Sequence, residues 1–359
     1  MASAHSAAAS TDTRHVPDEA LAALAAFLGD QGVEIGSSLS SSRIGDGRSN
    51  LTYLVSDGRR DVVLRRPPLP PFDPSAHDVL REARTVAALA HTGVAVPRVL
   101  AIDHDGDILG APFYVMEHVP GHVVTTATPQ ALSRTDDHRR MGLALADGLA
   151  AVHGADPGKR GLEHLVRRGD YLQRQLSRFR RILQNGGHRH LPDVAVVGRW
   201  LEDNLPDPVQ ARLVHGDYRI GNVMWAPDVP VRLAAILDWE LASLGDPMAD
   251  VAFLLATYPV PGDSDGALLS MAPATLEPGF PSRAELAHQY ERSAGVTMPD
   301  LRWHTTYVFW RGAVGLESFY QRMLAGTIPA EPFYLSLEHE VPELARRARL
   351  CTQQDQTIF

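Results

Sequence analysis

Four polar side chains that could do chemistry stand close together in the stretch LVHGDYRIGNVMW, residues 213–225. They are His215, Asp217, Arg219 and Asn222. The apolar flanks are too short to be helices and are typical of strand ends. Gly216 and Gly221 permit backbone conformations that other residues resist, so we expect the polar side chains in a tight, supported loop. A polar hairpin turn is the alternative interpretation of this stretch taken alone.

A second acidic cluster follows in ILDWE, where Asp238 comes directly after an apolar strand. A lone buried carboxylate is costly, so a purely structural reading explains Asp238 poorly. Carboxylate and amide oxygens hold divalent ions, and Asp238 and Asn222 could therefore hold a metal ion between them. Asp217 could accept the proton of an attacking hydroxyl, and Arg219 could steady a phosphoryl group in transfer. We interpret His215 as a hydrogen-bonded structural residue rather than as a ligand or a base.

The N-terminal part of the chain carries features that suit a nucleotide. Gly45 and Gly47 lie two apart in GDGRSN, between two expected strands. Arg65 lies on the third expected strand, and Glu82 on the next helix could orient it toward phosphates through a charge-assisted pair. Taken singly, these features are also typical of a plain turn, a solvated strand edge and a surface helix charge. Their order along the chain, followed by the loop and Asp238, favours phosphoryl transfer from a nucleotide.

Composition limits the other classes of function. The 359 residues are 44% hydrophobic and 21% charged, as in globular proteins. A net charge of −9 provides no broad attraction to nucleic acid or to an anionic membrane, so neither is expected as a partner. No apolar run is long enough to cross a bilayer and no secretory signal is recognisable, which predicts a cytoplasmic protein. The single Cys351 excludes an intramolecular disulfide.

The elements that position these residues are expected in two lobes, preceded by a disordered tail at residues 1–15. Residues 16–118 predict a helix, five strands and one further helix inserted after the third strand. Residues 119–359 carry apolar residues three and four apart and predict a larger, mainly helical lobe. Ser282 and Glu285 have the spacing of a capping box at a helix start. The expected fold class is α+β.

HGDYRIGN together with ILDWE resembles the catalytic and metal-binding motifs of the aminoglycoside phosphotransferase-like, or choline kinase-like, small-molecule kinases. The resemblance extends from Ile44 to about Gly326 and implies a bilobal, protein-kinase-like fold that uses ATP and Mg2+. It implies that Asp217 is the catalytic base and that Asn222 and Asp238 are the magnesium ligands.

The resemblance also implies a nucleotide site in the smaller lobe and the segment after it. The residues implied in binding ATP are Gly45, Gly47, Ser49, Asn50, Arg65, Glu82, Met116, Glu117 and Val119. The glycine-containing loop would cover the phosphates, a hinge at 117–119 would hydrogen-bond adenine through its backbone, and Met116 would lie behind it. One departure is Arg65, because such kinases often carry lysine there and arginine is not a neutral replacement. Arg66 is an alternative, although strand alternation points it to the other face.

The expected acceptor is a small molecule with a hydroxyl group. The helix expected in RGDYLQRQLSRFRR is strongly basic and suits an anionic acceptor better than a polycationic aminoglycoside, although a solvated helix face explains it equally well. SNLTYLV, VLRRPP, GAPFYVMEHVPG and YLQRQLSRF resemble the kinase-like domain fused to some acyl-CoA dehydrogenases and its stand-alone bacterial relatives. That subgroup implies phosphorylation of a hydroxyacyl-CoA, such as a 4-hydroxyacyl-CoA.

Other interpretations stay open at this point. An aminoglycoside or other antibiotic O-phosphotransferase is the main alternative. A catalytically silent nucleotide-binding partner would explain Arg65, and a metal-dependent hydrolase would use His215 with the two aspartates but would leave the N-terminal lobe unexplained. Trp239 and Glu240 stand where protein kinases have Phe-Gly, which argues against a protein kinase. A homodimer is left open, because the sequence does not determine the oligomeric state.

Overall fold

The computed structural model describes residues 14–45, 50–68, 78–156, 161–185, 189–263 and 266–353. The chain divides into two compact units. The first unit comprises the chain up to Ala87 together with Pro97–His118, and the second comprises Ala88–Val96 together with the chain from Val119 onward. Among the described helices, none is both long enough and apolar enough to cross a lipid bilayer.

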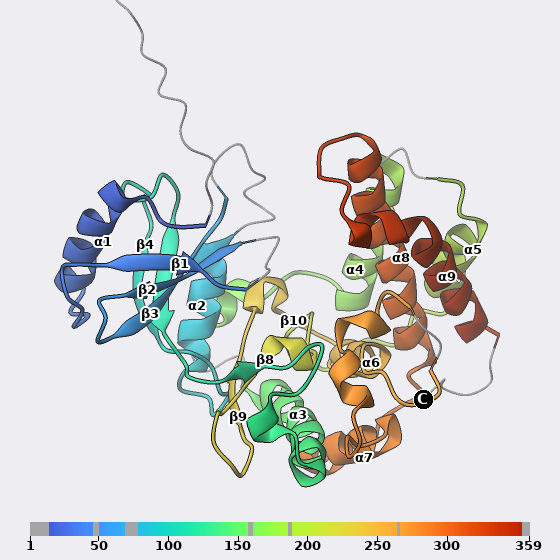
Figure 1. Cartoon of the computed structure of the whole chain (residues 1–359). Coiled ribbons are helices and arrows are strands. Elements are labelled where there is room, and N and C mark those ends of the chain that lie inside the picture. The colour runs from blue at the N-terminus through green and yellow to red at the C-terminus, as the bar shows by residue number, and fades with distance from the viewer. Residues whose placement is uncertain are drawn as a thin grey trace, which may run out of the picture. The chain divides into compact units, whose positions relative to one another are not determined.

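The first unit is built around an antiparallel sheet (Figure 1). Its strands are β1 (Ser40–Arg43), β2 (Leu51–Ser56), β3 (Asp61–Arg66), β4 (Val99–Asp103) and β5 (Phe113–Glu117). They pair in the order β1-β2-β3-β5-β4, and the five strands predicted for this region are confirmed. The turn between β2 and β3 is closed by Asp57, whose carboxylate accepts the N–H groups of Arg59 and Arg60.

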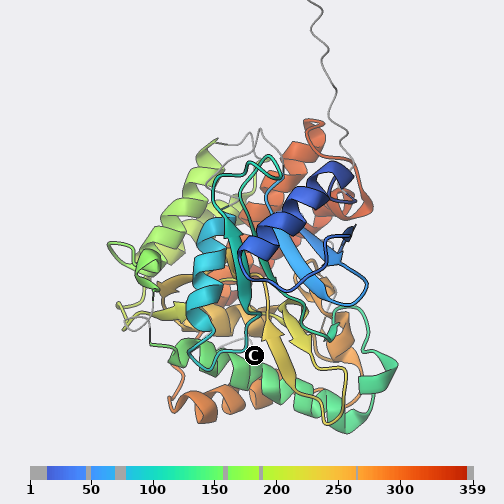
Figure 2. The ribbon, with the colours of Figure 1, turned by 90° about the vertical axis from the view of Figure 1, so that its left-hand side faces the viewer.

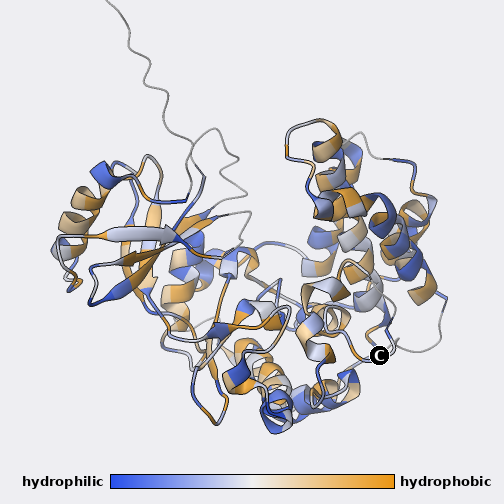
Figure 3. Cartoon of the chain, in the orientation of Figure 1, coloured by the Kyte–Doolittle hydropathy of each residue, from blue (hydrophilic) through white to orange (hydrophobic). Residues whose placement is uncertain are grey.

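Two helices cover this sheet, one on each face. They are α1 (Asp18–Asp30) and α2 (Val79–Leu89). Leu24 of α1 is buried in one cluster with Phe113, whereas Ala83 of α2 is buried with Tyr114. Because Phe113 and Tyr114 are consecutive in β5, their side chains point to opposite faces, so the two helices lie on opposite sides. Figure 3 shows α2 in both colours, since it buries apolar residues on one side and carries charges on the other.

The second unit is mainly helical and contains two small sheets. Its helices are α3 (Thr135–Gly154), α4 (Tyr171–Asn185), α5 (Pro192–Asp203), α6 (Met248–Ala256), α7 (Arg283–Ala294), α8 (Arg302–Leu324) and α9 (Pro332–Cys351), with several short 3-10 turns between them. Its strands are β6 (His122–Val123), β7 (Arg212–Val214), β8 (Val223–Trp225), β9 (Leu233–Ile236) and β10 (Ser243–Gly245). Helices α3 and α7 lie side by side, as Figure 2 shows at the bottom of the view.

The main core of the second unit lies among α4, α5, α6, α8 and α9. Trp310 of α8 is fully buried, and its indole N–H donates to the carbonyl of Val194 in α5 at 2.9 Å. Trp303 stacks on Tyr307 with 5.5 Å between the ring centroids. Cys351 closes α9 inside this core, where burial raises the pKa of its thiol to about 12. The aromatic residues of α8 therefore serve mainly to hold the helices together.

Strands β7 and β8 flank the polar stretch at 215–222 but do not pair with each other. β7 pairs with β10, and β8 lies between β6 and β9. The hairpin interpretation of this stretch is therefore wrong, because each flanking strand pairs with strands other than its neighbour across the stretch. The stretch instead connects two separate sheets, so its conformation depends on groups outside it. We call residues 215–222 the polar loop.

The capping box predicted at the start of α7 is confirmed. The hydroxyl of Ser282 accepts the backbone N–H of Glu285 at 3.2 Å, and the Glu285 carboxylate accepts the N–H of Ser282 at 2.9 Å. Two backbone donors that the first helical turn leaves without intrahelical partners are thereby satisfied.

We expect Ser282→Ala to lower the free energy of unfolding by about 1 kcal/mol, because an N–H at the helix start loses its acceptor. Chemical denaturation followed by circular dichroism measures this. Ser177→Ala makes the same chemical change at an exposed position inside α4, and it should leave the stability unchanged or slightly raised. Equal unfolding curves for Ser282→Ala and the unmodified protein would contradict the expectation.

Candidate functional site

The polar loop brings two side chains onto the carboxylate of Asp217. Asn222 donates its Nδ2 hydrogens to the Asp217 carboxylate and to the Asp217 carbonyl, both at 2.8 Å. Arg219 lies on the same carboxylate, with Nε 3.7 Å from Oδ2. Gly221 lies against the arginine, since an added Cβ would collide with the guanidinium. The spacing that suggested a site in the sequence therefore produces direct contacts.

Asp238 is brought to the polar loop by the backbone of Leu237. The N–H of Leu237 donates to the carbonyl of Asn222 at 2.8 Å, and the carbonyl of Leu237 lies 2.9 Å from Nε2 of His215. Asp238 follows directly, with a left-handed backbone at φ +66°. That conformation is uncommon for residues with a side chain and is often found at functional sites. Asp217, Asn222 and Asp238 thus lie in one neighbourhood although they come from two segments.

Several charges act on Asp217. Loss of hydration raises the pKa of its carboxyl group above the usual value, and the negative charge of Asp238 raises it further. Arg219, His215 and the hydrogen bond from Asn222 act in the opposite direction. The carboxylate is therefore a better proton acceptor than an exposed aspartate, while Asn222 and Arg219 hold its orientation.

The donor set around Asp238 fits a hard divalent cation such as Mg2+, which prefers oxygen ligands. The Nδ2 group of Asn222 is committed to Asp217, which leaves its Oδ1 atom as the one that could face an ion. Within the described ranges, no cluster of three or more His, Cys, Asp or Glu residues could hold a metal on its own. An ion held by Asn222 and Asp238 would therefore take its remaining ligands from phosphate oxygens and water.

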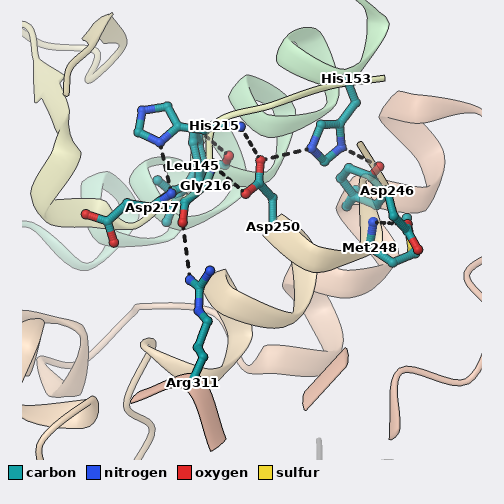
Figure 4. A network of polar contacts seen from close by, with 11 residues as sticks. Leu145, His153, His215, Gly216, Asp217, Asp246, Met248, Asp250 and Arg311 are labelled. Atoms are coloured by element: carbon teal, nitrogen blue, oxygen red, sulfur yellow. Dashed lines mark hydrogen bonds and ion pairs between the residues drawn. The ribbon is translucent and has the colours of Figure 1, made fainter. Parts of the chain in front are cut away.

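A buried carboxylate that the sequence analysis did not single out holds the polar loop from one side. Asp250 of α6 accepts the N–H of His215 at 2.6 Å and that of Gly216 at 2.8 Å (Figure 4). His153 of α3 lies 3.4 Å from the same carboxylate, and its other ring nitrogen lies 2.7 Å from the Tyr290 hydroxyl. Burial alone would raise the pKa of Asp250, but the hydrogen bond and charge of His153 and the contacts with His215 bring it below its usual value.

Arg311 of α8 holds the same backbone from the other side. Its guanidinium donates to the carbonyl of Gly216 at 3.2 Å and lies over the ring of Phe253 at 4.4 Å (Figure 4). Gly216 has φ +88°, and an added Cβ would lie 2.9 Å from the Leu241 carbonyl oxygen. A side chain at this position is therefore excluded by both conformation and space. The backbone that leads to Asp217 is therefore held by Asp250 on one side and by Arg311 on the other.

Two sequence signals for these supports were present. Asp246 and Asp250 stand four apart in the apolar run GDPMADVAFLL, and both are buried, where a carboxylate without partners is costly. Asp238, for which burial was expected, is only half-buried. Asp246 indeed pairs with His304 at 2.8 Å. Arg311 is a lone charge in an apolar part of α8. His153 shows no comparable signal, because histidine is common in helices for many reasons.

In the first unit, Arg65 and Glu82 form the predicted ion pair. Arg65 Nε lies 2.9 Å from Glu82 Oε2, and the side chains are only 13% and 2% exposed. The readings of Arg65 as a solvated strand edge and of Glu82 as a surface charge are therefore wrong. Arg66 points to the other face of β3, where it lies 5.7 Å from the centre of the Tyr53 ring. Strand alternation thus assigns the pairing with α2 to Arg65.

The predicted phosphate loop is described only at its ends. Gly45 follows β1 with φ +71°, and Asn50 is buried just before β2. Gly47 and Ser49 lie outside the described residues.

The predicted hinge begins where β5 ends. Met116 is half-buried on the face covered by α2. Glu117 donates its N–H to the carbonyl of Arg98 at 2.9 Å, and its carboxylate accepts the N–H of Arg98 at the same distance. Val119 opens the second unit. The N–H of Glu117 is therefore committed to the sheet, and only other backbone groups of this segment could meet a ligand.

Comparisons of the chain with known proteins agree on its family. Residues 40–303 match the phosphotransferase enzyme family. The chain is 32% identical over 283 residues to acyl-CoA dehydrogenase family member 10 of Mus musculus and 33% identical over 301 residues to acyl-CoA dehydrogenase family member 11 of Gallus gallus. These matches cover 78% and 82% of this chain but only 26% and 38% of the relatives, so the chain spans well under half of their length.

Solved structures share the fold. A protein of Ralstonia eutropha JMP134, described as a candidate aminoglycoside phosphotransferase, is 26% identical with a TM-score of 0.76, over 95% of this chain and 99% of that one. A thermostable mutant of the aminoglycoside phosphotransferase APH(4)-Ia, in ternary complex with AMP-PNP and hygromycin B, has a TM-score of 0.58 at 18% identity, over 90% of this chain and 97% of that one. The predicted α+β, kinase-like fold class is confirmed.

We expect Asp250→Asn to lower the free energy of unfolding at neutral pH by about 3 kcal/mol, because an amide NH2 would face backbone donors in a buried site. The pKa of Asp250 in the folded protein lies below the ordinary value of 3.8. The ionised carboxylate therefore stabilises the fold above about pH 4, and this effect is lost as the pH falls through the folded-state pKa.

Denaturation curves measured between neutral pH and acid should show the gap between the two proteins shrinking below about pH 4. Asp228→Asn, at an exposed aspartate of the same unit, serves as the control and should stay close to the unmodified protein throughout. A gap for Asp250→Asn that is constant over this pH range would contradict the assignment.

Proposed function

Because the chain belongs to the phosphotransferase enzyme family, we propose that it transfers the γ-phosphoryl group of ATP to a hydroxyl group of a small molecule. The observation that carries the proposal is the meeting of Asp217, Asn222 and Asp238 through direct and backbone hydrogen bonds. Transfer to a hydroxyl needs a proton acceptor and a cation held beside the phosphates, and these residue types supply both. The likeness in fold to a protein solved with AMP-PNP supports ATP as the donor.

Asp217 is the proposed base. Its raised pKa favours proton uptake, and Asn222 and Arg219 hold the carboxylate in place. The acceptor hydroxyl gives its proton to Asp217 while its oxygen forms a new bond to the γ-phosphorus. The bond between that phosphorus and the β,γ-bridging oxygen breaks, and ADP leaves with the bond's electron pair. Arg219 is proposed to steady the moving phosphoryl group.

Asn222 and Asp238 are the proposed ligands of Mg2+. When bound, Mg2+ neutralises charge on the phosphates. Asn222 can serve both Asp217 and an ion because its amide has two different ends, and the Nδ2 end is already bonded to Asp217. Asp238 has a left-handed backbone and directly follows Leu237, which is hydrogen-bonded to the polar loop. These two constraints fix the backbone position from which the Asp238 carboxylate extends.

Arg65, oriented by Glu82, is proposed to bind the phosphates that are not transferred. The buried ion pair keeps the guanidinium in one place, so arginine can fill the position where related kinases often have lysine. This pair supports an active kinase over a silent nucleotide-binding partner. The other proposed contacts with ATP are Gly45, Gly47, Ser49, Asn50, Met116, Glu117 and Val119.

For the acceptor we propose a hydroxyacyl-CoA, such as a 4-hydroxyacyl-CoA. Relatives named as acyl-CoA dehydrogenase family members contain a matching region within much longer chains, which links this kind of domain to acyl-CoA chemistry. In the second unit, Arg167 and Arg174 line a cavity of about 310 Å³ at the start of α4, together with Asp170, Asp207 and Asp246. The arginines suit the phosphates of CoA. We also propose a cytoplasmic location, which is compatible with both proposed substrates, ATP and the hydroxyacyl-CoA.

We expect release of ADP from Mg·ATP in the presence of a hydroxyacyl-CoA and little or none with aminoglycosides, because the matching regions of the relatives link this kind of domain to acyl-CoA chemistry. A coupled ADP assay over both compound classes, with the acyl-CoA lacking the hydroxyl as the blank, measures this. Turnover confined to aminoglycosides would favour an antibiotic phosphotransferase, for which the description of the Ralstonia eutropha protein is the supporting observation.

We expect Asp217→Asn to reduce turnover by roughly 10²- to 10⁴-fold, because the amide cannot accept the hydroxyl proton. Binding of Mg·ATP, measured by titration calorimetry, should be largely retained. Asp228→Asn is the matched control and should leave turnover unchanged, since Asp228 is exposed and pairs only loosely with Arg232. If Asp217→Asn turns over at the normal rate, Asp217 is not the base.

A further inference from the structure

Arg311 is a half-buried cation that reaches the polar loop and has spare hydrogen-bond donors. One N–H of its guanidinium donates to the carbonyl of Gly216 at 3.2 Å. Its other contacts are with Phe253 and Tyr307, at 4.4 Å and 5.8 Å from the ring centres, and Arg311 also interacts with the Tyr307 hydroxyl. Among the residues that the structure describes, no carboxylate lies within ion-pair distance of it. A guanidinium has five N–H donors, so several remain for a ligand.

The nearest buried carboxylate does not serve as a counter-ion for Arg311. Asp250 lies on the N–H side of the same backbone and is occupied by His215, Gly216 and His153 (Figure 4). Arg311 lies on the carbonyl side of Gly216 (Figure 4). Asp250 and Arg311 therefore bond to different groups of the same backbone and not to each other.

A second arginine charge acts in the surroundings of Arg311. Burial raises the pKa of Tyr307 to about 12, and the charges of Arg311 and Arg178 act against this rise. Two arginine charges are therefore felt at the same phenol. Arg311 therefore offers positive charge to oxygen atoms that carry negative or partial negative charge, although the charges of Asp246 and Asp250 also act close by, on Tyr171.

Arg311 is also close enough to the proposed base to act on the same small molecule. It bonds to the carbonyl of the residue before Asp217, and backbone and side-chain bond lengths then place the guanidinium within roughly 10 Å of the Asp217 carboxylate. A molecule whose hydroxyl and acyl oxygen are separated by a few carbon atoms can reach both groups at once. The bond to Gly216 keeps the guanidinium at a set distance from Asp217.

Resting on the proposed function, we propose that Arg311 is an acceptor-binding residue whose remaining N–H groups bind the acyl oxygen of the substrate. The acceptor is then a hydroxy compound with a carbonyl or carboxylate oxygen a few carbons from its hydroxyl. A hydroxyacyl thioester and a free hydroxy acid share this chemistry. Arg311 selects for that oxygen, and Asp217 receives the proton of the hydroxyl.

The test removes the oxygen from the substrate and the guanidinium from the protein in a four-way comparison. The substrates are 4-hydroxybutyryl-CoA and the matching thioether, S-(4-hydroxybutyl)-CoA, which lacks the carbonyl oxygen. The proteins are the unmodified chain and Arg311→Met. The unmodified chain should prefer the thioester in kcat/KM by about 10-fold or more, the usual effect of a charge-assisted hydrogen bond, and Arg311→Met should show no preference.

Arg322→Met provides the matched control, since Arg322 is an exposed arginine of the same helix that lies over Phe319, and it should keep the full preference. Arg311→Lys, which retains charge but not the planar fork, should keep part of it. Free 4-hydroxybutyrate is the third acceptor, and its turnover distinguishes a carboxylate from a thioester oxygen. If Arg311→Met turns over too slowly, calorimetric binding of both CoA compounds gives the same comparison.

A preference that survives in Arg311→Met, with both substrates slowed equally, would overturn the proposal and leave Arg311 as a support of the loop. Equal use of thioester and thioether by the unmodified chain would also overturn it. Absence of turnover with every hydroxyacyl compound would instead refute the proposed function, and this inference with it.

Discussion

Two consecutive backbone N–H groups, those of His215 and Gly216, donate to the single buried carboxylate of Asp250. A charge removed from water persists only where hydrogen bonds replace its hydration, and here the backbone and His153 provide them. These bonds determine how the chain passes through Gly216 and therefore where Asp217 begins. A catalytic side chain is most effective when the residues around it hold it in the productive geometry. The chemistry proposed for the polar loop thus depends on a residue that takes no part in it.

A second constraint joins the polar loop to the segment that carries Asp238. Leu237 binds the polar loop at both ends, through Asn222 and through the ring of His215. That ring also lies against Trp239, with 4.7 Å between centroids, so the aromatic residue after Asp238 packs on the histidine before Asp217. Residues between the polar side chains therefore act as structure: the motif alternates between groups that face the site and groups that fasten it to the core.

Much of this arrangement was predictable from the sequence because it is local. The strands of the first unit, the helix start at Ser282 and the contact of Asp217 with Asn222 follow from neighbouring residue types. The hairpin interpretation of the polar loop failed because β7 pairs with β10 and β8 with β6 and β9, and periodicity does not reveal which strands pair. His153 was missed for the same reason: it becomes informative only when α3 and α6 are seen together. Asp250 and Arg311 are each an isolated charge in an apolar run, a pattern that is visible in the sequence. We used that pattern only for Asp238.

Cys351 offers a consequence of a different kind. It is the only cysteine of the 359-residue chain, it is fully buried at the end of α9, and its raised pKa keeps it as an unreactive thiol. An alkylating reagent can modify it only when the C-terminal helix leaves its place among α5 and α8. The natural chain therefore contains its own reporter of local opening, and a cysteine introduced elsewhere on the surface can be labelled without background.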